Sequence, residues 1–371
     1  MAKEHKLPRV GITHGDINGI GYEVIMKALA PEGITELFTP VIFGSPSVAG
    51  YYRKTLSLDN FKAVAIASAE QAEPGRINLV DIGASDLTVE PGVATAEGGA
   101  AARAALDCAI EALKNRQIDV LVTAPINKEA MKMAGFPFPG HTEYLQQELG
   151  DGASALMLLC KEGGPRVALV TVHLPVSEVS EAITTEAIEE KLRTLHHTMR
   201  KDFALERPKI AVLSLNPHAG DGGAIGEEED AIISPAIKQA YSRKIMAFGP
   251  YAADGFFGSG QYKKFDAILA MYHDQGLAPF KLLAMDEGVN FTAGLPYVRT
   301  SPDHGTGYDI VGQGIADAAS MRAAIFEAID IHRRRWRYIR SRSNPLKKQY
   351  VDRSGDKVTI DLSASEDVIL N

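Results

Sequence analysis

Short apolar runs alternate with longer segments of helical periodicity along nearly the whole chain. The short runs are rich in Val, Ile, Leu and Ala and lack polar alternation, as in parallel strands that are covered on both faces. Each run ends at a polar turn, and a segment with apolar residues at helical spacing follows. This repeated order predicts an α/β protein whose sheets are mostly parallel and carry helices on both faces.

The apolar runs predict strands at residues 9–13, 40–44, 63–67, 77–82, 118–125, 154–160, 166–174, 209–217, 265–274 and 289–301. The periodic segments predict helices at residues 22–30, 45–56, 95–114, 140–149, 182–203, 226–244 and 315–335. A glycine-rich turn at 15–21 has neither GxGxxG nor P-loop spacing, so we interpret it as a structural turn. Dinucleotide binding at this turn is the alternative.

Composition limits the class of protein. The 371 residues and 45% hydrophobic content exceed what one core usually holds, so we expect two domains or lobes. A net charge of −8 argues against a nucleic-acid partner. No apolar stretch has the length of a membrane span or of a signal-peptide core. Cys108 and Cys160 lie in apolar runs, as buried free thiols of a reducing compartment do, so we expect a cytoplasmic protein with no membrane partner.

Basic residues gather at 332–342, directly after a predicted helical segment. Cations are favoured near a helix C-terminus by the helix dipole. We therefore expect a solvated last helical turn, with a subunit contact as the alternative.

Three histidines follow apolar runs in the same context. His173, His218 and His273 each come after a run of Val, Ile, Leu or Ala and precede Pro, Gly or Asp. Parallel strands deliver such residues to the carboxyl edge of the sheet, where ligands of open sheets bind. Neutral imidazoles that converge there form a divalent-metal site with room for substrate. The alternative is that each histidine is satisfied separately by a backbone carbonyl.

Two further stretches contain candidate ligand-binding residues. His141 and Thr142, followed by Glu143, begin a predicted helix, where free N–H groups can hold an anion; a plain helix cap is the alternative. Between 273 and 309, cationic and amide side chains interrupt apolar segments and indicate a phosphorylated, carboxylate-bearing substrate. The polar residues of this second stretch are His273, Asp274, Lys281, Asn290, Arg299, Asp303, His304 and Asp309.

Seven blocks in this order closely resemble 4-hydroxythreonine-4-phosphate dehydrogenases of pyridoxal phosphate biosynthesis, over about residues 10–348. The blocks are TAPINK, GHTEYL, VHLPV, LNPHAG, MYHDQG, VNFTAGLPYVRTS and DHGTGYD. The resemblance implies an isopropylmalate dehydrogenase-like fold with a cleft between its two α/β/α domains. It also implies a homodimer with the active site near the subunit interface. The implied domains are an NAD-binding domain of residues 1–130 plus 300–371, and a metal, substrate and dimerisation domain of residues 131–299.

The implied reaction is oxidation of the secondary hydroxyl of 4-phosphooxy-L-threonine by NAD, followed by decarboxylation. The family's metal ligands match His173, His218 and His273; zinc is the first expectation, with magnesium, cobalt or manganese as alternatives. Its substrate-binding residues match His141, Thr142, Lys281, Asn290 and Arg299. Likeness to the adenosine loop of isopropylmalate dehydrogenases places His304, Gly305 and Asp309 beside NAD. Asp274, Lys281 and a metal-bound water are the candidate proton acceptors.

The chain also departs from the family pattern. The first turn reads GDINGIGYE where GDPAGIGPE is usual, Ala224 takes a usual histidine position, and GPYAADG replaces GPxPADT. These changes leave the three histidines in place but affect substrate selectivity. The alternative functions are therefore an NAD-dependent dehydrogenase of erythronate or threonate 4-phosphate, a metal-dependent hydrolase or aldolase, and a non-catalytic binding protein.

Overall fold

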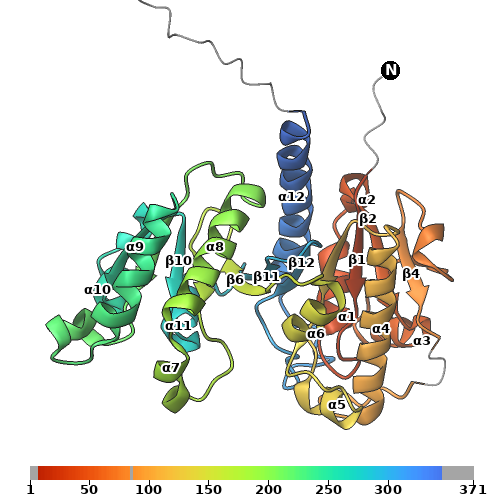
Figure 1. The fold of residues 1–371 in the computed structure, drawn as a ribbon. Coiled ribbons are helices and arrows are strands. Elements are labelled where there is room, and N and C mark those ends of the chain that lie inside the picture. The colour runs from red at the N-terminus through yellow and green to blue at the C-terminus, as the bar shows by residue number, and fades with distance from the viewer. Residues whose placement is uncertain (1–6, 84–86, 345–371) are drawn as a thin grey trace, which may run out of the picture.

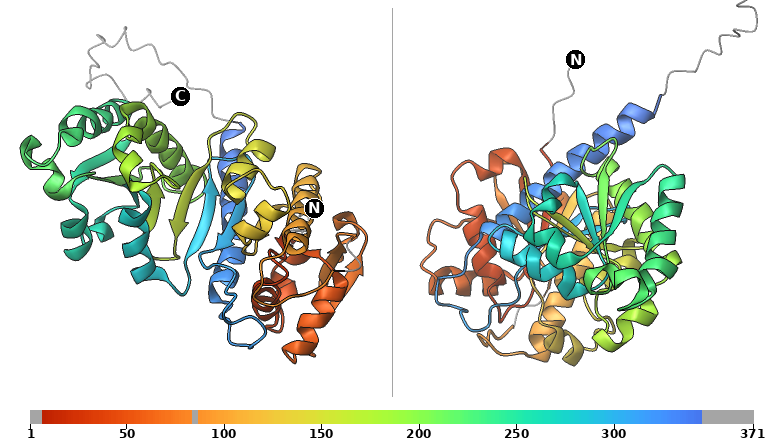
Figure 2. Two further views of the ribbon diagram at one scale, coloured as in Figure 1. Left: turned by 90° about the horizontal axis from the view of Figure 1, so that it is seen from below. Right: turned by 90° about the vertical axis from the view of Figure 1, so that its left-hand side faces the viewer.

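A computed structural model describes residues 7–83 and 87–344 of the chain. The elements form two lobes: the N-terminal elements α1 to α6 lie on one side, and α7 to α11 lie on the other. The long C-terminal helix α12 lies between them (Figure 1). Helices cover both faces of the sheet that runs through the lobes (Figure 2).

One sheet of twelve strands spans both lobes, in the order β3-β4-β2-β1-β5-β12-β11-β6-β7-β10-β8-β9. Its strands are β1 (Arg9–Thr13), β2 (Thr39–Gly44), β3 (Ala63–Ile66), β4 (Ile77–Asp81), β5 (Val120–Thr123), β6 (Leu156–Cys160), β7 (Arg166–Leu169), β8 (Lys209–Leu213), β9 (Met246–Tyr251), β10 (Ala267–Ala270), β11 (Val289–Ala293) and β12 (Arg299–Pro302). Among these described strands, the antiparallel pairs are β11–β12, β11–β6 and β6–β7. The predicted α/β class with a mostly parallel sheet is confirmed. The predicted domain borders stay a prediction.

The helices are α1 (Gly21–Leu29), α2 (Ile34–Leu37), α3 (Pro46–Thr55), α4 (Ala96–Lys114), α5 (Lys128–Met133), α6 (His141–Leu149), α7 (Val176–Ala182), α8 (Thr185–Lys201), α9 (Ser234–Ser242), α10 (Ala253–Gly258), α11 (His273–Ala284) and α12 (Ala319–Arg342). Shorter turns are η1 (Ala69–Gln71), η2 (Pro217–Gly223), η4 (Gln261–Lys264) and a π-helical turn, η3 (Glu229–Ile233). Within the described ranges, no helix is long and apolar enough to cross a membrane.

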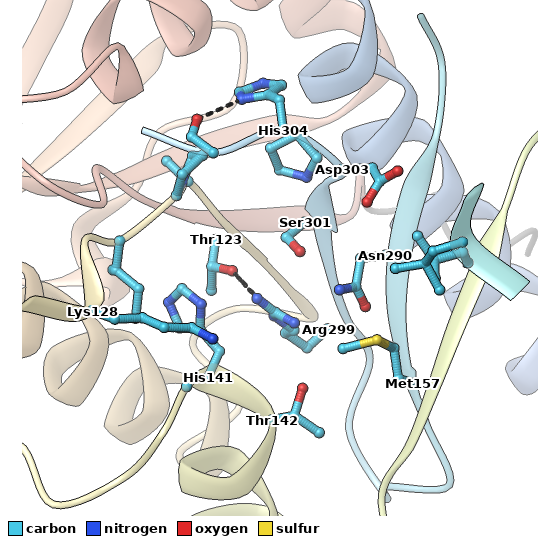
Figure 3. Close-up of a pocket in the computed structure, with 18 of the residues that line it drawn as sticks. Thr123, Lys128, His141, Thr142, Met157, Asn290, Arg299, Ser301, Asp303 and His304 are labelled. Atoms are coloured by element: carbon cyan, nitrogen blue, oxygen red, sulfur yellow. Dashed lines mark hydrogen bonds between the residues drawn. The ribbon is translucent and has the colours of Figure 1, made fainter. Parts of the chain in front are cut away.

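Alternate residues of the strands pack into different cores. Val120 and Val122 of β5 join the core beneath α1 and α12, whereas Leu121 joins the core beneath α4. In the other lobe, Leu269 of β10 packs toward α8, and Ile268 packs toward α11. Burial on both faces explains why these strands read as continuous apolar runs. The middle of the sheet, where β5, β12 and β11 are neighbours, borders the pocket drawn in Figure 3.

Helix α11 differs from the sequence prediction. The predicted strand 265–274 ends at Ala270, and His273 is the first residue of a twelve-residue helix. Gly276 and Pro279 lie inside that helix and hide its periodicity, because both residues have poor helix propensity. Gly276 is required by packing: a Cβ there would lie 2.8 Å from side-chain carbons of Val167 and Leu169.

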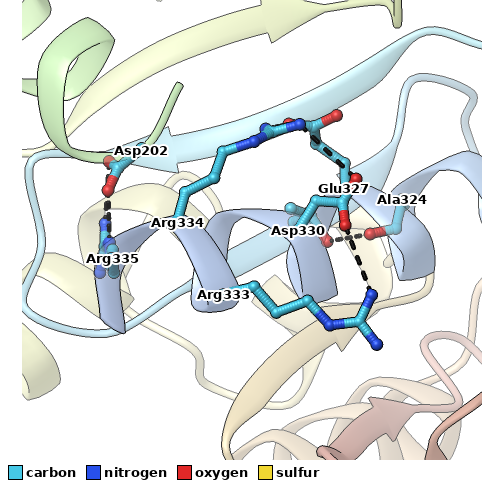
Figure 4. Close-up of polar contacts among 8 residues, drawn as sticks. Asp202, Ala324, Glu327, Asp330, Arg333, Arg334 and Arg335 are labelled. Atoms are coloured by element: carbon cyan, nitrogen blue, oxygen red, sulfur yellow. Dashed lines mark hydrogen bonds and ion pairs between the residues drawn. The ribbon is translucent and has the colours of Figure 1, made fainter. Parts of the chain in front are cut away.

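The basic segment of α12 is only partly solvated. Arg335 is buried and its Nε donates a 2.6 Å hydrogen bond to Asp202 Oδ1, next to the end of α8 (Figure 4). Its Nη1 also donates to the carbonyl oxygen of Pro296 at 2.9 Å. Arg333 and Asp330 instead form an exposed ion pair at 3.7 Å. The expectation of a wholly solvated last turn is therefore wrong for Arg335, which fastens α12 to the second lobe.

The substitution Asp202→Asn should lower the free energy of unfolding by about 3 kcal/mol, because it leaves the Arg335 guanidinium buried without its counter-charge. Urea unfolding measures this loss. The matched variant Asp330→Asn removes a half-exposed carboxylate that pairs with Arg333 and Arg334, and it should cost less than about 1 kcal/mol. Equal losses in the two variants would contradict the buried pair's role.

The glycine-rich turn at 15–21 encloses a fully buried histidine. His14 has 0% exposure and stacks on Tyr22, with ring centroids 5.3 Å apart. Burial lowers the pKa of His14 from 6.5 to about 4, so the ring is neutral at pH 7. Gly15 has φ +72°, and a Cβ there would lie 2.3 Å from the carbonyl oxygen of Pro125. These contacts support the interpretation of a structural turn.

His14 should make stability depend on pH. The unfolded chain binds a proton near pH 6.5 and the folded chain only near pH 4, so stability is complete above pH 6.5 and falls as the pH drops. This residue alone should remove about 2 kcal/mol between pH 7 and pH 5. In His14→Phe, which keeps a ring on Tyr22, the measured fall should be smaller by that amount. Parallel pH profiles of unfolding free energy in the two proteins would refute the assignment.

Candidate active site

A cavity of about 300 Å³ lies where the two lobes meet. Its walls come from β5, α5 and α6 of one lobe, from β6 and α11 of the other, and from β11 and β12 between them. Figure 3 shows Arg299 in the middle of the cavity, with His141 and Lys128 on one side and Asn290 and Asp303 on the other. The polar lining residues are Thr123, Lys128, His141, Thr142, Glu143, His173, His273, Lys281, Asn290, Arg299, Ser301, Asp303 and His304.

Arg299 is a buried cation on the wall of this cavity. It is 3% exposed on β12, and its Nε and Nη2 donate to Thr123 Oγ1 while its Nη1 donates to Thr292 Oγ1 at 3.0 Å. Burial lowers the pKa of Arg299 to about 9, whereas the charge of Glu143 acts in the opposite direction. Hydroxyl groups hold the guanidinium in place but do not neutralise it. The arrangement therefore favours an anion in the cavity.

The start of α6 lies beside this cation. His141 is the first residue of α6 and its N-cap is Gly140, so the cap comes from the preceding turn rather than from Thr142. Burial and the charge of Arg299 lower the pKa of His141 well below its ordinary value, which makes the ring neutral at pH 7. His141 Nε2 is buried and has no hydrogen-bond partner. The neutral ring is therefore free to bind a ligand group.

Two of the three predicted metal ligands lie together. The rings of His173 and His273 are 6.3 Å apart between centroids, and both line the cavity. Each Nδ1 faces a carboxylate: Glu143 Oε1 is 3.6 Å from His173, and Asp274 Oδ1 is 2.7 Å from His273. The contact with His173 is the main cause that lowers the pKa of Glu143. Carboxylates in this position fix ring orientation in metal sites.

His218 lies apart from these two rings. It follows β8, which pairs with β10 beside β7, so the three histidines do follow neighbouring strands. It does not line the cavity, however, and no group of three or more His, Cys, Asp or Glu side chains in the described ranges is arranged to hold a metal ion. The three-histidine metal site stays a prediction.

The turn that carries His218 has an unusual backbone. Residues 218–222 all have positive φ, although His218, Ala219 and Asp221 are not glycines. Glu229 supports this turn from the π-helical η3: its Oε1 accepts 2.8 Å hydrogen bonds from the backbone N–H groups of Leu215 and Asn216. Strained backbone and π-turns occur often at functional sites.

The remaining predicted substrate residues line the cavity. Lys281 reaches it from α11, although the sequence placed this residue in a strand-like or turn-like segment. Asn290 of β11 has a buried Oδ1 with no partner. Asp274 is 85% exposed beside His273 and does not belong to the lining.

The segment predicted to contact NAD follows β12. His304 and Gly305 line the cavity, whereas Asp309 is exposed and lies outside it. The Tyr308 hydroxyl donates to Asp16 Oδ2, and Ile20 N donates to the carbonyl oxygen of Thr306 at 2.9 Å. The glycine-rich turn thus supports the segment that carries His304.

Buried polar atoms without partners gather in this cavity. Twelve side-chain atoms of the described residues are buried and unpaired, and five of them belong to cavity residues: His141 Nε2, Glu143 Oε2, Asn290 Oδ1, Asp303 Oδ2 and His304 Nε2. Such atoms cost free energy unless a ligand or water pairs with them. Sequence reasoning missed Thr123, Lys128 and Ser301, for which the available signal was their position at strand ends or in the TAPINK block.

Comparisons with known proteins identify the family of this chain. Residues 36–328 match the family described as pyridoxal phosphate biosynthetic protein PdxA. A 4-hydroxythreonine-4-phosphate dehydrogenase of Bacteroides thetaiotaomicron is 53% identical over 97% of this chain and 98% of its own.

Solved structures give the same result. The 4-hydroxythreonine-4-phosphate dehydrogenase of Klebsiella pneumoniae has a TM-score of 0.74 at 31% identity, over 89% of this chain and 99% of its own. A terephthalate 1,2-cis-dihydrodiol dehydrogenase of Burkholderia xenovorans has a TM-score of 0.58 at 26% identity, over 87% and 98% of the two chains. The family match over most of the chain and the 53% identity show that this chain belongs to the PdxA family of pyridoxal phosphate biosynthetic proteins.

Proposed function

We propose that the protein is an NAD-dependent dehydrogenase that oxidises the secondary hydroxyl of 4-hydroxythreonine 4-phosphate. The 2-amino-3-oxo acid phosphate that results then loses CO2 to give 3-amino-2-oxopropyl phosphate. The main support for this proposal is the cavity between the lobes. It is lined by a buried cation and by five buried polar atoms without partners, which a small polar ligand could pair with. The names of the relatives supply the substrate, and the cavity's volume suits a molecule of that size.

The anionic groups of the substrate bind to the donors of the cavity. Arg299 supplies a fixed guanidinium, and His141 and Thr142 add donors at the first turn of α6. Lys281 and Asn290 supply further donors from the opposite lobe. Because both lobes contribute, bound substrate is held from two sides and kept in a fixed orientation for the reaction.

We also propose a divalent metal, with zinc first and magnesium, cobalt or manganese as alternatives. His173 and His273 fit such a group, because each Nδ1 faces a carboxylate and the opposite ring nitrogen remains available as a ligand. His218 is the third proposed ligand. We propose that the protein is a homodimer with its active site near the subunit interface, so that His218 of one subunit can complete the metal site of the other. A bound metal supplies Lewis-acid stabilisation of the substrate oxygen.

NAD is the proposed cofactor, and it accepts the hydride when bound. His304, Gly305 and Asp309 are the residues proposed to hold it. The buried, unpaired Nε2 of His304 fits a ligand's polar atom. Of the two side chains proposed to accept the hydroxyl proton, Lys281 lines the cavity and Asp274 does not; Lys281 Nζ would do so in its neutral amine form and bind anions in its ammonium form. A cytoplasmic location agrees with the two free cysteines, Cys108 and Cys160.

The purified protein with NAD and divalent metal should form NADH from 4-hydroxythreonine 4-phosphate with kcat/KM at least about tenfold above that for erythronate or threonate 4-phosphate. Absorbance at the NADH band measures this, with and without a chelator. A preference for a hydroxy acid phosphate would favour the alternative dehydrogenase. Turnover of phosphorylated substrates without NAD, and no thermal shift with NAD, would favour a hydrolase or aldolase.

The variant His218→Asn tests the proposed metal site, because Asn tolerates the left-handed backbone at this position. It should lower bound metal from about one ion per subunit to a small fraction, measured by plasma emission after gel filtration. The matched control is Asp221→Asn, in the same turn and also at positive φ, which should keep its metal. Full metal content in His218→Asn would remove this residue from the site.

A further inference from the structure

The cavity has an uneven distribution of charge. Arg299 lies in the middle of the cavity, with His141 and Lys128 on the side of α5 and α6, and its charge lowers the pKa of His141 (Figure 3). Asp303 lies on the other side with Asn290, directly after β12 (Figure 3). Lys281 and His273 are the groups whose charges act on Asp303, rather than Arg299. The Asp303 carboxylate therefore lies on the opposite side of the cavity from His141 and Lys128, with the buried guanidinium between them.

One oxygen of the Asp303 carboxylate lacks a hydrogen-bond partner, although the charges of Lys281 and His273 act on the group. Its Oδ2 is buried without a hydrogen bond, and burial raises the pKa of the group. The backbone holds the residue firmly, since Asp303 N donates to Ser320 Oγ at 3.0 Å and Ser320 Oγ donates to the carbonyl oxygen of Gly288 at 2.6 Å. A buried carboxylate is costly unless a cation or a donor meets it. A purely anionic ligand would worsen this cost.

We propose that Asp303 binds the α-ammonium group of the substrate and so determines selectivity for amino acid phosphates over hydroxy acid phosphates. This inference rests on the proposed function and adds a residue that neither the motifs nor the relatives' names assign. The ammonium group supplies the positive donor that Oδ2 lacks. Erythronate and threonate 4-phosphate have a hydroxyl group at C2 in place of the ammonium group, so they bring no positive charge to Asp303.

The two other carboxylates near the cavity are less suited to this role. Glu143 Oε1 already faces His173 at 3.6 Å, and the charge of Glu143 acts on Arg299. Asp274 faces His273 and is 85% exposed outside the lining. Asp303 lines the cavity on the side away from His141 and Lys128.

The test compares Asp303→Asn with the parent protein on two substrates that differ only in the ammonium group: 4-hydroxythreonine 4-phosphate and the hydroxy acid 4-phosphate of matching stereochemistry. We expect kcat/KM for the amino acid phosphate to fall about 10- to 100-fold, and that for the hydroxy acid phosphate to stay equal or rise. The matched control is Asp59→Asn, because Asp59 is exposed and does not line the cavity. It should change kcat/KM for neither substrate.

Isothermal titration calorimetry with the same two compounds, with metal and without NAD, gives the ratio of Kd values independently of turnover. The selectivity should shift by the same 10- to 100-fold, with an unchanged thermal melt showing that the variant folds. An equal loss for both compounds, or no loss for either, overturns the assignment. If the parent binds the amino acid phosphate through Asp303 but forms no NADH, the proposed reaction fails and this inference stands.

Discussion

A buried guanidinium without a matching carboxylate is the constraint on which the site depends. Arg299 lies between β5 and β11, and threonine hydroxyls from those two strands hold it. The hydroxyls fix the position of the guanidinium but do not neutralise its charge. An anionic ligand would neutralise it, and His141, which is buried and neutral beside Arg299, adds no competing charge. The charge at the junction of the lobes therefore favours an anionic ligand.

The second lobe contributes residues to this site that are distant in sequence but adjacent in space. β7 and β10 are neighbours and carry His173 and His273 to the edge that borders the cavity. The antiparallel strands β11 and β6 then join this edge to the strands of the first lobe. Residues one hundred positions apart thus share a cavity because the strands that precede them are paired.

Much of this arrangement could be predicted from sequence. The apolar runs indicated most of the strands, although β9 was not predicted and the extended segment 289–301 holds two antiparallel strands, β11 and β12. The predicted polar residues included His141, Lys281, Asn290 and Arg299, all of which line the cavity. The limits have physical reasons. Helix α11 was hidden by its glycine and proline, and the path of the His218 turn depends on a left-handed backbone that composition does not reveal. Pairing of Arg335 with Asp202 is a tertiary contact that no local pattern encodes.

The continuous sheet has a mechanical consequence. In many two-lobed enzymes a flexible connection lets the lobes swing apart, but here backbone ladders join β5, β12, β11 and β6 without interruption. A wide hinge opening would tear those ladders, whereas a change in strand twist would keep them intact. An opening of the cavity that keeps these ladders intact would therefore take place through strand twist or through the loops at its rim.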